Sequence, residues 1–104
     1  MADEIKDIAN FDRLIHEPAR LAIMAVLSAC EQADFAFLLN STGLSKGNLS
    51  AHLSKLEEGG YLTITKSFKG KYPNTSCALT AAGRRAFNAY RKQYLTLAQR
   101  LGQQ

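Results

Sequence analysis

The stretch GLSKGNLSAHLSKLEEGGYL, residues 43–62, carries the pattern that decides the fold of this sequence. Ser45 can cap the start of a helix, and the pair Gly59–Gly60 can end it, because a left-handed backbone conformation costs least at glycine. One side of this helix carries Leu49, Leu53 and Leu56. The spacing predicts an amphipathic helix over 46–58 whose leucine side packs against a core.

The other side of the predicted helix carries small polar residues and lysines. Asn48, Ser54 and Lys55 lie opposite the leucines, while Lys46, Ser50 and His52 flank them. Small side chains allow a helix to approach a groove closely, and serine, asparagine, histidine and lysine can hydrogen-bond to base edges or phosphates. A short polar side is also what any solvated helix shows, so this pattern alone leaves both interpretations open.

Three helices are predicted before this stretch. Ile5, Ile8, Phe11 and Leu14 or Ile15 recur at helical spacing, which favours an N-terminal amphipathic helix ending near His16. Pro18 suits the first turn of a second helix, which is apolar around most of its girth. Asp34 can cap a third helix over 35–40, followed by a glycine-containing turn over 41–43. Two helices joined by such a turn are the components of a helix-turn-helix.

The pattern after Gly60 alternates as in a strand. Leu62 and Ile64 alternate with threonines, and after a turn over 69–74 the alternation resumes as far as Leu79, which predicts an antiparallel hairpin with a long tip. The tip segment KSFKGKYPN, residues 66–74, holds three lysines and two aromatic residues. These lysines can grip a sugar-phosphate backbone, or they can serve solubility alone.

A last helix is predicted from its cap at Thr80 through Arg100. Its apolar side chains recur every three or four residues, at Phe87, Tyr90, Tyr94, Leu97 and Leu101. Tyr94, Leu97 and Leu101 lie beyond the reach of so small a core, so we expect a partner surface to cover them.

Composition indicates one globular domain of 104 residues, with 46% hydrophobic and 21% charged residues. Residues 1–40 carry a net charge of −4 and residues 41–104 a net charge of +8, and no acidic residue follows Glu58. A basic half of this kind attracts polyanions such as nucleic acid. We expect a cytoplasmic protein, because the longest apolar run is far too short to span a membrane and Met1–Asn10 is acidic where a signal peptide is basic.

No motif for catalysis, a metal or a cofactor stands out. Cys30 and Cys77 lie far apart without a CxxC pair or a Cys/His cluster, so buried reduced thiols are expected rather than a zinc site or a disulfide. His16 and His52 have no nucleophile or carboxylate at a catalytic motif spacing, and there is no glycine-rich phosphate loop. We therefore expect a non-enzyme without a metal or cofactor.

The order of these elements resembles the winged-helix transcriptional regulators of the MarR and ArsR type. HEPARLAIMAVL (16–27) is similar to the start of their core helix, LSKGNLSAHLSKLEEGGYL (44–62) to their recognition helix, and ALTAAGRRAF (78–87) to their return strand and final helix. The wing segment FKGKYPNTSCALTAAGRRAF is similar to a compact winged-helix DNA-binding subgroup. The resemblance covers about residues 10–95. It implies a mainly α fold with a two-stranded β-wing, a winged helix-turn-helix, over residues 1–104.

This resemblance also implies a function and a set of site residues. The implied activity is sequence-specific binding of duplex DNA by a homodimer that regulates transcription, with helix 46–58 in the major groove and a wing over 61–80 on the backbone or minor groove. Two-fold symmetry predicts a palindromic operator with half-sites roughly 34 Å apart. The implied DNA contacts are Ser45, Lys46, Asn48, Ser50, His52 and Lys55 on the helix and Lys66, Lys69 and Lys71 on the wing. The expected dimer residues are Ile5, Ile8, Phe11, Tyr94, Leu97 and Leu101.

Three alternatives stay open beside that function. His52 borders the leucine side and can instead pack or hydrogen-bond within the chain. The winged helix can serve as a protein-interaction module whose basic surface docks an acidic partner. A small apolar effector can occupy a crevice near the dimer helices, although no residue announces one. The paired cysteines of ArsR-type metal sensors are missing from DFAFLLNSTG (34–43), which argues against metal sensing there.

Overall fold

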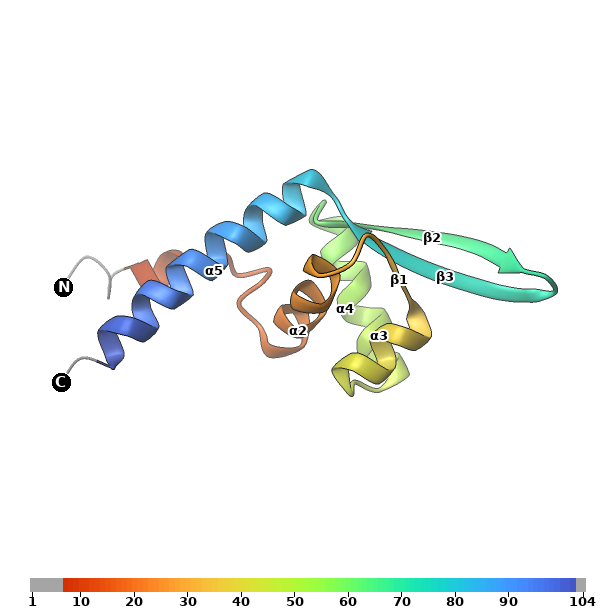
Figure 1. Cartoon of the computed structure of the whole chain (residues 1–104), viewed down its shortest axis with the longest axis horizontal. Coiled ribbons are helices and arrows are strands. Elements are labelled where there is room, and N and C mark those ends of the chain that lie inside the picture. Colours follow the sequence, from red (N-terminus) through yellow and green to blue (C-terminus); the bar gives the residue numbers. More distant parts are fainter. Residues whose placement is uncertain (1–6, 103–104) are drawn as a thin grey trace.

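The computed structural model describes residues 7–102 and shows three helices at the centre, a β-hairpin at one end and a long helix at the other (Figure 1). The overall dimensions are 57 × 24 × 21 Å. The elements are η1 (Asp7–Asn10), α2 (Pro18–Ser28), β1 (Ala33–Asp34), α3 (Phe35–Thr42), α4 (Lys46–Glu58), β2 (Leu62–Lys69), β3 (Tyr72–Leu79) and α5 (Ala81–Leu101). The predicted fold class, mainly α with a two-stranded wing, is confirmed.

The core lies where α2, α3, α4 and the base of the hairpin meet. Leu49, Leu53 and Leu56 of α4 are at most 2% exposed, as the leucine spacing predicted. α4 packs against α2, whose Ile23, Met24 and Leu27 are fully buried in the same core. Burying each such side chain stabilises the fold by about 1.5–3 kcal/mol, so this leucine side fixes which face of α4 is left outside.

Side-chain caps define the helix starts that the sequence predicted. Asp34 accepts a hydrogen bond from the backbone N–H of Phe37, and Ser45 accepts one from that of Asn48. Thr80 does the same for Gly83 at the start of α5. α3 runs two residues further than predicted, to Thr42, and α4 has the predicted bounds.

The predicted N-terminal helix ending near His16 is wrong for the described residues. Only Asp7–Asn10 form a short 3₁₀ helix, and a turn occupies the chain from Asp12 to Glu17. The Asp12 carboxylate accepts the backbone N–H of Leu14 at 2.9 Å, which offers the backbone an alternative to helical hydrogen bonds. Phe11 and Ile15 are buried as the spacing suggested, but a turn rather than a helix presents them to the core.

The wing differs from its prediction at the tip. β2 and β3 pair without interruption from Leu62 with Leu79 to Lys69 with Tyr72, so the turn is only Gly70–Lys71 and the long tip over 69–74 is wrong. Gly70 has φ of 63°, which glycine adopts without strain. Pro73 lies in β3 beyond the part that β1 covers, and such an open edge tolerates proline.

A short strand that the sequence pattern did not indicate completes the sheet. β1 pairs with β3 through Ala33 with Cys77 and Asp34 with Ser76, giving the order β1-β3-β2. Cys77 is 1% exposed, and burial raises the pKa of its thiol to about 11. Cys30 is half-buried, and both thiols are free.

The start of α5 sits directly on the base of the wing. Thr80 donates its backbone N–H to the carbonyl of Tyr61 at 3.0 Å and its hydroxyl to the carbonyl of Gly60 at 2.6 Å. Gly83 is buried here, and a Cβ on it would lie 2.0 Å from the Tyr61 carbonyl oxygen. Only glycine allows this approach. Within residues 7–102, no helix has both the length and the apolar composition that a membrane span requires.

Candidate nucleic-acid interface

The exposed side of α4 is the surface that the buried leucines leave outside. Ser45, Lys46, Asn48, Ser50 and Lys55 are all exposed, so the structure presents these predicted contact residues on the outside of the helix. Gly47 and Ser54 are exposed among them. The surface is therefore built from small polar side chains with a lysine near each end.

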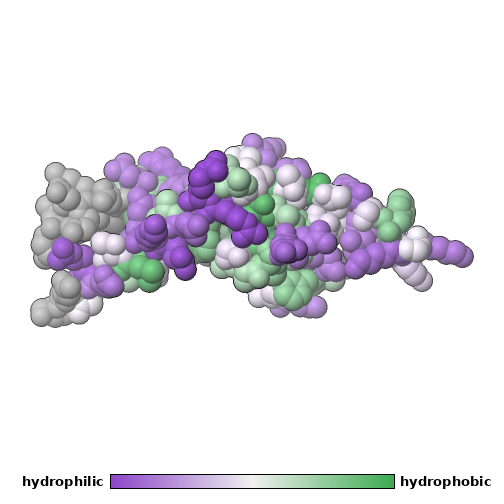
Figure 2. All heavy atoms as spheres, turned by 45° about the horizontal axis from the view of Figure 1, so that its top comes forward, coloured by the Kyte–Doolittle hydropathy of each residue, from purple (hydrophilic) through white to green (hydrophobic). Residues whose placement is uncertain are grey.

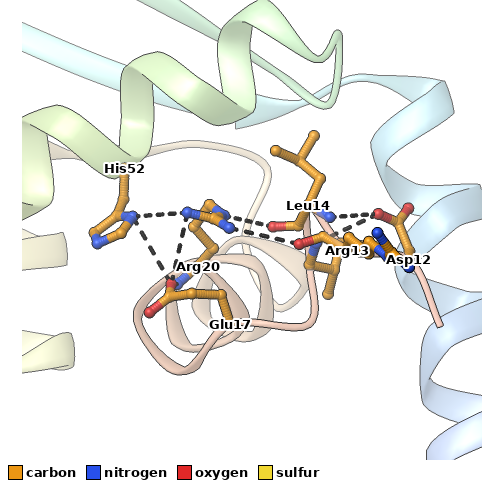
Figure 3. A network of polar contacts seen from close by, with 7 residues as sticks. Asp12, Arg13, Leu14, Glu17, Arg20 and His52 are labelled. Carbon is orange, nitrogen blue, oxygen red and sulfur yellow. Dashed lines mark hydrogen bonds and ion pairs between the residues drawn. The ribbon is translucent and has the colours of Figure 1, made fainter. Parts of the chain in front are cut away.

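His52 is placed differently from the other predicted contacts of α4. Its side chain is 21% exposed and turns toward the start of α2. Nδ1 of His52 lies 3.2 Å from Nη1 of Arg20 and 3.8 Å from the carboxylate of Glu17 (Figure 3). The internal hydrogen bond that the sequence left open is thus present.

Arg20 joins α4 to the turn before α2. Its Nε donates to the carbonyl of Leu14 at 2.6 Å, and its side chain is only 12% exposed. Leu14 in turn packs so closely on Gly59, just after α4, that a Cβ at Gly59 would meet its side chain at 2.2 Å. These contacts between the 12–17 turn and α4 were not predicted from the sequence. Glu17, Pro18 and Arg20, which form the start of a helix, were the signal that could have indicated them.

Glu17 caps α2 and stays ionised within this network. Its carboxylate accepts the backbone N–H of Arg20 at 2.8 Å. Burial alone would raise its pKa, but hydrogen bonds from the backbone of Arg20 and Ala19, the charge of Arg20, and the charge of His52 whenever its imidazole is protonated, hold the pKa of Glu17 below its ordinary value. The network at this side of α4 therefore contains one carboxylate and one guanidinium around the imidazole.

The two faces of the wing carry different lysines. Side chains alternate along β2, so Lys66 shares a face with the buried Leu62 and the half-buried Ile64, whereas Lys69 points to the other face. Lys69 lies 3.9 Å from the Asp34 carboxylate on that face, in an exposed ion pair. Lys71 lies in the turn. Within residues 7–102, Lys66 and Lys71 have no acidic partner.

An open hollow of about 510 Å³ separates α4 from the face of the wing that carries Lys66. Ser50 and Ser54 line it from α4, and Lys66 and Thr75 from the wing. Glu57 closes its base by accepting the backbone N–H of Ile64 at 3.1 Å. This hydrogen bond ties the end of α4 to the wing.

The wing surface is hydrophilic except near its tip, where Figure 2 shows a hydrophobic patch. The large apolar side chains at this end are Phe68, 73% exposed, and Tyr72, 77% exposed. They do not fold back onto the hairpin. The basic half of the chain also contributes structural cations, because Arg84 donates to the carbonyls of Ser28 and Cys30 at 3.3 and 3.0 Å.

The expected dimer residues differ in how far their own chain covers them. Phe11 is 4% exposed and stacks edge-on against Tyr90, so it serves the core of its own chain. Leu97 packs partly against that core. Tyr94 and Leu101 are 49% and 66% exposed. Ile5 lies outside the described residues, as does the side chain of Ile8.

Two further hydrogen bonds hold the 12–17 turn in place. The Tyr61 hydroxyl donates to the Asp12 carboxylate, and Nδ1 of His16 lies 2.7 Å from the Tyr90 hydroxyl of α5. The hydrogen bond to Asp12, burial and the negative charge of Asp12 together raise the pKa of Tyr61 to about 12. The turn thus contacts the start of the wing and α5 as well as α4.

We expect Tyr61→Phe to reduce the dependence of stability on alkaline pH. The fold favours the neutral phenol, so the contribution of Tyr61 is fully present below pH 10, its ordinary pKa, and is lost as the pH rises toward about 12. Urea unfolding at fixed pH values should show the wild type more stable than Tyr61→Phe by about 1 kcal/mol at pH 9. That difference should shrink between pH 10 and 12.

Tyr72→Phe is the matched control, because it removes a hydroxyl from a ring that is 77% exposed. It should follow the wild type at every pH. A constant difference between the wild type and Tyr61→Phe across the alkaline range would contradict the assigned role of the hydrogen bond to Asp12.

A helix-turn-helix whose second helix is exposed beside a two-stranded hairpin defines the winged-helix class of proteins. Residues 19–97 match the family model described as a winged helix DNA-binding domain, and the chain belongs to that family. It is accordingly a DNA-binding domain of the kind found in transcription regulators.

Several known proteins are similar to this chain. An uncharacterized protein of Methanocaldococcus jannaschii is 34% identical over 90 residues, which cover 86% of this chain and 97% of the relative. A transcriptional regulator homologue from Pyrococcus horikoshii OT3 has a TM-score of 0.86 at 25% identity, over 96% of this chain and 98% of that one. The transcriptional repressor CouR, solved with a 23-mer DNA duplex, shares the fold with a TM-score of 0.75 at 22% identity, over 98% and 77% of the two chains.

Proposed function

We propose that this protein regulates transcription as a homodimer that binds a palindromic duplex, with α4 in the major groove and the wing on the backbone or minor groove. Two α4 helices related by two-fold symmetry would enter successive major grooves roughly 34 Å apart. N- and C-terminal segments would supply the dimer contacts. The observation that carries this proposal is the composition of the exposed side of α4, where small polar side chains stand between Lys46 and Lys55.

The arrangement of α4 and the wing supports contact with a duplex. A helix that carries small side chains can enter a groove about 12 Å wide without being held off the bases. Lys66 then stands across the hollow from Ser50 and Ser54, where a sugar-phosphate strand beside the groove would lie. CouR, of the same fold, was solved on a DNA duplex, which supports the same mode of use here.

The second half of α5 supports a dimer. This part of the helix extends past the central helices (Figure 1) and exposes Tyr94, Leu95 and Leu101 by about half or more. Exposed apolar side chains that recur along one helix are typical of a surface covered by a second chain. Ile5 and Ile8 are proposed to add to this interface.

The experiment that tests this function is selection of bound duplexes from a random pool, followed by titration of the recovered duplex against salt. Recovery of a palindrome is the expected result. The double variant Lys66→Ala with Lys71→Ala should weaken binding to all duplexes. It should also lower the slope of log K against log salt by about 0.9 for each phosphate that the wing no longer neutralises.

Arg91→Ala with Lys92→Ala is the matched control, since it removes two positive charges from exposed positions on α5. Its salt slope should stay close to that of the wild type. Equal slopes for the wild type and the wing variant would contradict the wing contacts. A pool without any enriched sequence would contradict specific DNA binding and favour the acidic protein partner instead.

A further inference from the structure

The contact with Arg20 selects one tautomer of the neutral His52 imidazole. A guanidinium group has donors and no acceptor, so Nη1 of Arg20 must donate across the 3.2 Å that separates it from Nδ1 of His52. A neutral imidazole that accepts at Nδ1 carries its proton on Nε2. Figure 3 shows the second ring nitrogen of His52 turned away from both Arg20 and Glu17. His52 therefore presents a single outward N–H donor.

The position of His52 on α4 places this donor beside the exposed polar side. Asn48 precedes His52 by four residues and Lys55 follows it by three, so the three side chains lie along one stripe of the helix. Asn48 and Lys55 are exposed, and 21% of the His52 side chain is accessible. Solvent, or a duplex in its place, can reach the edge of the ring while Arg20 covers the opposite edge.

The hydrogen bonds of Arg20 fix its guanidinium beside the imidazole of His52. Its Nε is fixed on the carbonyl of Leu14 at 2.6 Å, which leaves the fork of the guanidinium to meet His52 and the carbonyl of Arg13 at 3.5 Å. Glu17 lies 3.9 Å from Nη1 of Arg20 and balances its charge. Arg20 uses Nε for the Leu14 carbonyl and Nη1 for the imidazole, whereas a lysine has all its donors on one nitrogen and does not reproduce this fixed fork. The imidazole is thus fixed in orientation and in tautomer by one side chain.

We propose that Arg20 is a positioning residue for DNA recognition, and that it acts by holding His52 as an Nε2–H donor to an acceptor atom of the duplex. The acceptor assigned to it is a purine N7 or a phosphate oxygen, two of the acceptors that a donor at the edge of a groove helix meets. This assignment rests on the proposed function and adds to it a contact that depends on a residue of α2.

Nuclear magnetic resonance tests the tautomer without DNA. The ring nitrogen shifts of the two histidines at pH 8 should show His52 with its proton on Nε2, and His16→Gln assigns the signals because it leaves His52 as the only histidine. Arg20→Lys should move His52 toward a mixture of tautomers. A purely structural Arg20 would leave the tautomer unchanged. Observation of the Nδ1–H tautomer in the wild type would overturn the assignment.

Binding of the selected duplex tests the donor. His52→Leu should lower affinity about tenfold, as expected for one missing hydrogen bond with its partner left unpaired. His52→Gln should retain affinity, because the amide oxygen can accept from Arg20 while the amide nitrogen donates outward. Equal affinities for the wild type and His52→Leu would overturn the proposal.

A double-variant cycle separates positioning from a general loss of structure. Arg20→Lys should lower affinity in the wild-type background and have little further effect in the His52→Leu background, because the two residues act as one unit. Equal losses of affinity in both backgrounds would overturn the proposal and leave Arg20 with a structural role only, in holding α4 against the 12–17 turn. Urea unfolding measures the stability of each variant and so checks that each one is folded under the conditions of the binding experiment.

Substituted duplexes identify the acceptor. If N7 is the acceptor, replacing purines by their 7-deaza analogues should weaken DNA binding by the wild type and leave binding by His52→Leu unaffected. If a phosphate oxygen is the acceptor, methylphosphonate linkages should have this selective effect instead. If neither substitution discriminates between the two proteins, the assignment of the acceptor is wrong. A wild-type protein that selects no duplex would overturn the proposed function as well, so the two failures are distinguishable.

Discussion

Gly83→Ala is expected to lower the free energy of unfolding by about 3 kcal/mol, the upper part of the range for overpacking a close contact. The added Cβ would lie 2.0 Å from the Tyr61 carbonyl oxygen and 2.9 Å from its carbonyl carbon, and both atoms belong to the backbone. No side-chain rotation can relieve this contact. The start of α5 would have to move, which would break the 3.0 Å hydrogen bond from Thr80 to the same carbonyl.

The helix propensity of alanine does not compensate for this clash, because it is worth only about 1 kcal/mol over glycine. Thermal and urea unfolding measure the effect, and a loss of about 3 kcal/mol should lower the Tm by more than about 10 °C in a domain of this size. Gly47→Ala is the matched control. Nothing lies within 4 Å of a Cβ at Gly47, so this variant should be at least as stable as the wild type. Similar stability for both variants would show that α5 does not sit on Tyr61.

Asn48→Asp is expected to lower affinity for the selected duplex about 100-fold or more without harming the fold. The change keeps the shape of the side chain, removes the amide donors and places a negative charge where α4 would meet the bases. Loss of a bidentate base contact costs about 1–3 kcal/mol, and repulsion from phosphates adds to it. Asn48 lies in the first turn of α4, where a carboxylate favours the helix dipole, so stability should hold or rise by a few tenths of a kcal/mol.

If Asn48→Asp lowers affinity while stability holds or rises, the loss of binding comes from the lost DNA contact and not from unfolding. Fluorescence anisotropy with the selected duplex and urea unfolding measure the two quantities. Asn88→Asp is the matched control, because it makes the same substitution at an exposed position on α5 and adds the same charge. Equal losses of affinity in both variants would indicate that net charge alone governs binding and that α4 does not enter the groove.

Elements with local signals were predictable from the sequence, and those set by distant contacts were not. α4 has its cap, its leucines and its terminating glycines within one short stretch, and its bounds were predicted correctly. The N-terminal segment failed because Phe11 and Ile15 have helical spacing, while the Asp12 carboxylate and Pro18 favour a turn. β1 was missed because a segment of two residues is too short to show the alternating pattern of a strand. Only its pairing with β3 makes it a strand.

The candidate interface was partly predictable for the same reason. Helical periodicity identifies which side of α4 the core covers, and so identifies Asn48 and Ser50 as outward. It cannot reveal that Arg20, 32 residues before His52, reaches across from α2 to hold the imidazole. The sequence also predicted a turn from residue 69, and only the register of the hairpin shows that β2 continues to Lys69, which puts Lys66 and Lys69 on opposite faces.

The strand order also leaves the β2 edge of the described sheet unpaired. β2 is an outer strand of the β1-β3-β2 sheet, and in the part of the chain that the structure describes no other strand pairs with its free edge. An unpaired edge is a template on which another chain can add a strand, and lysines along such an edge oppose that addition. Lys66 and Lys69 lie on this strand, so Lys66, which we propose for phosphate binding, would together with Lys69 also oppose strand addition. A variant stripped of them would lose solubility along with affinity for DNA.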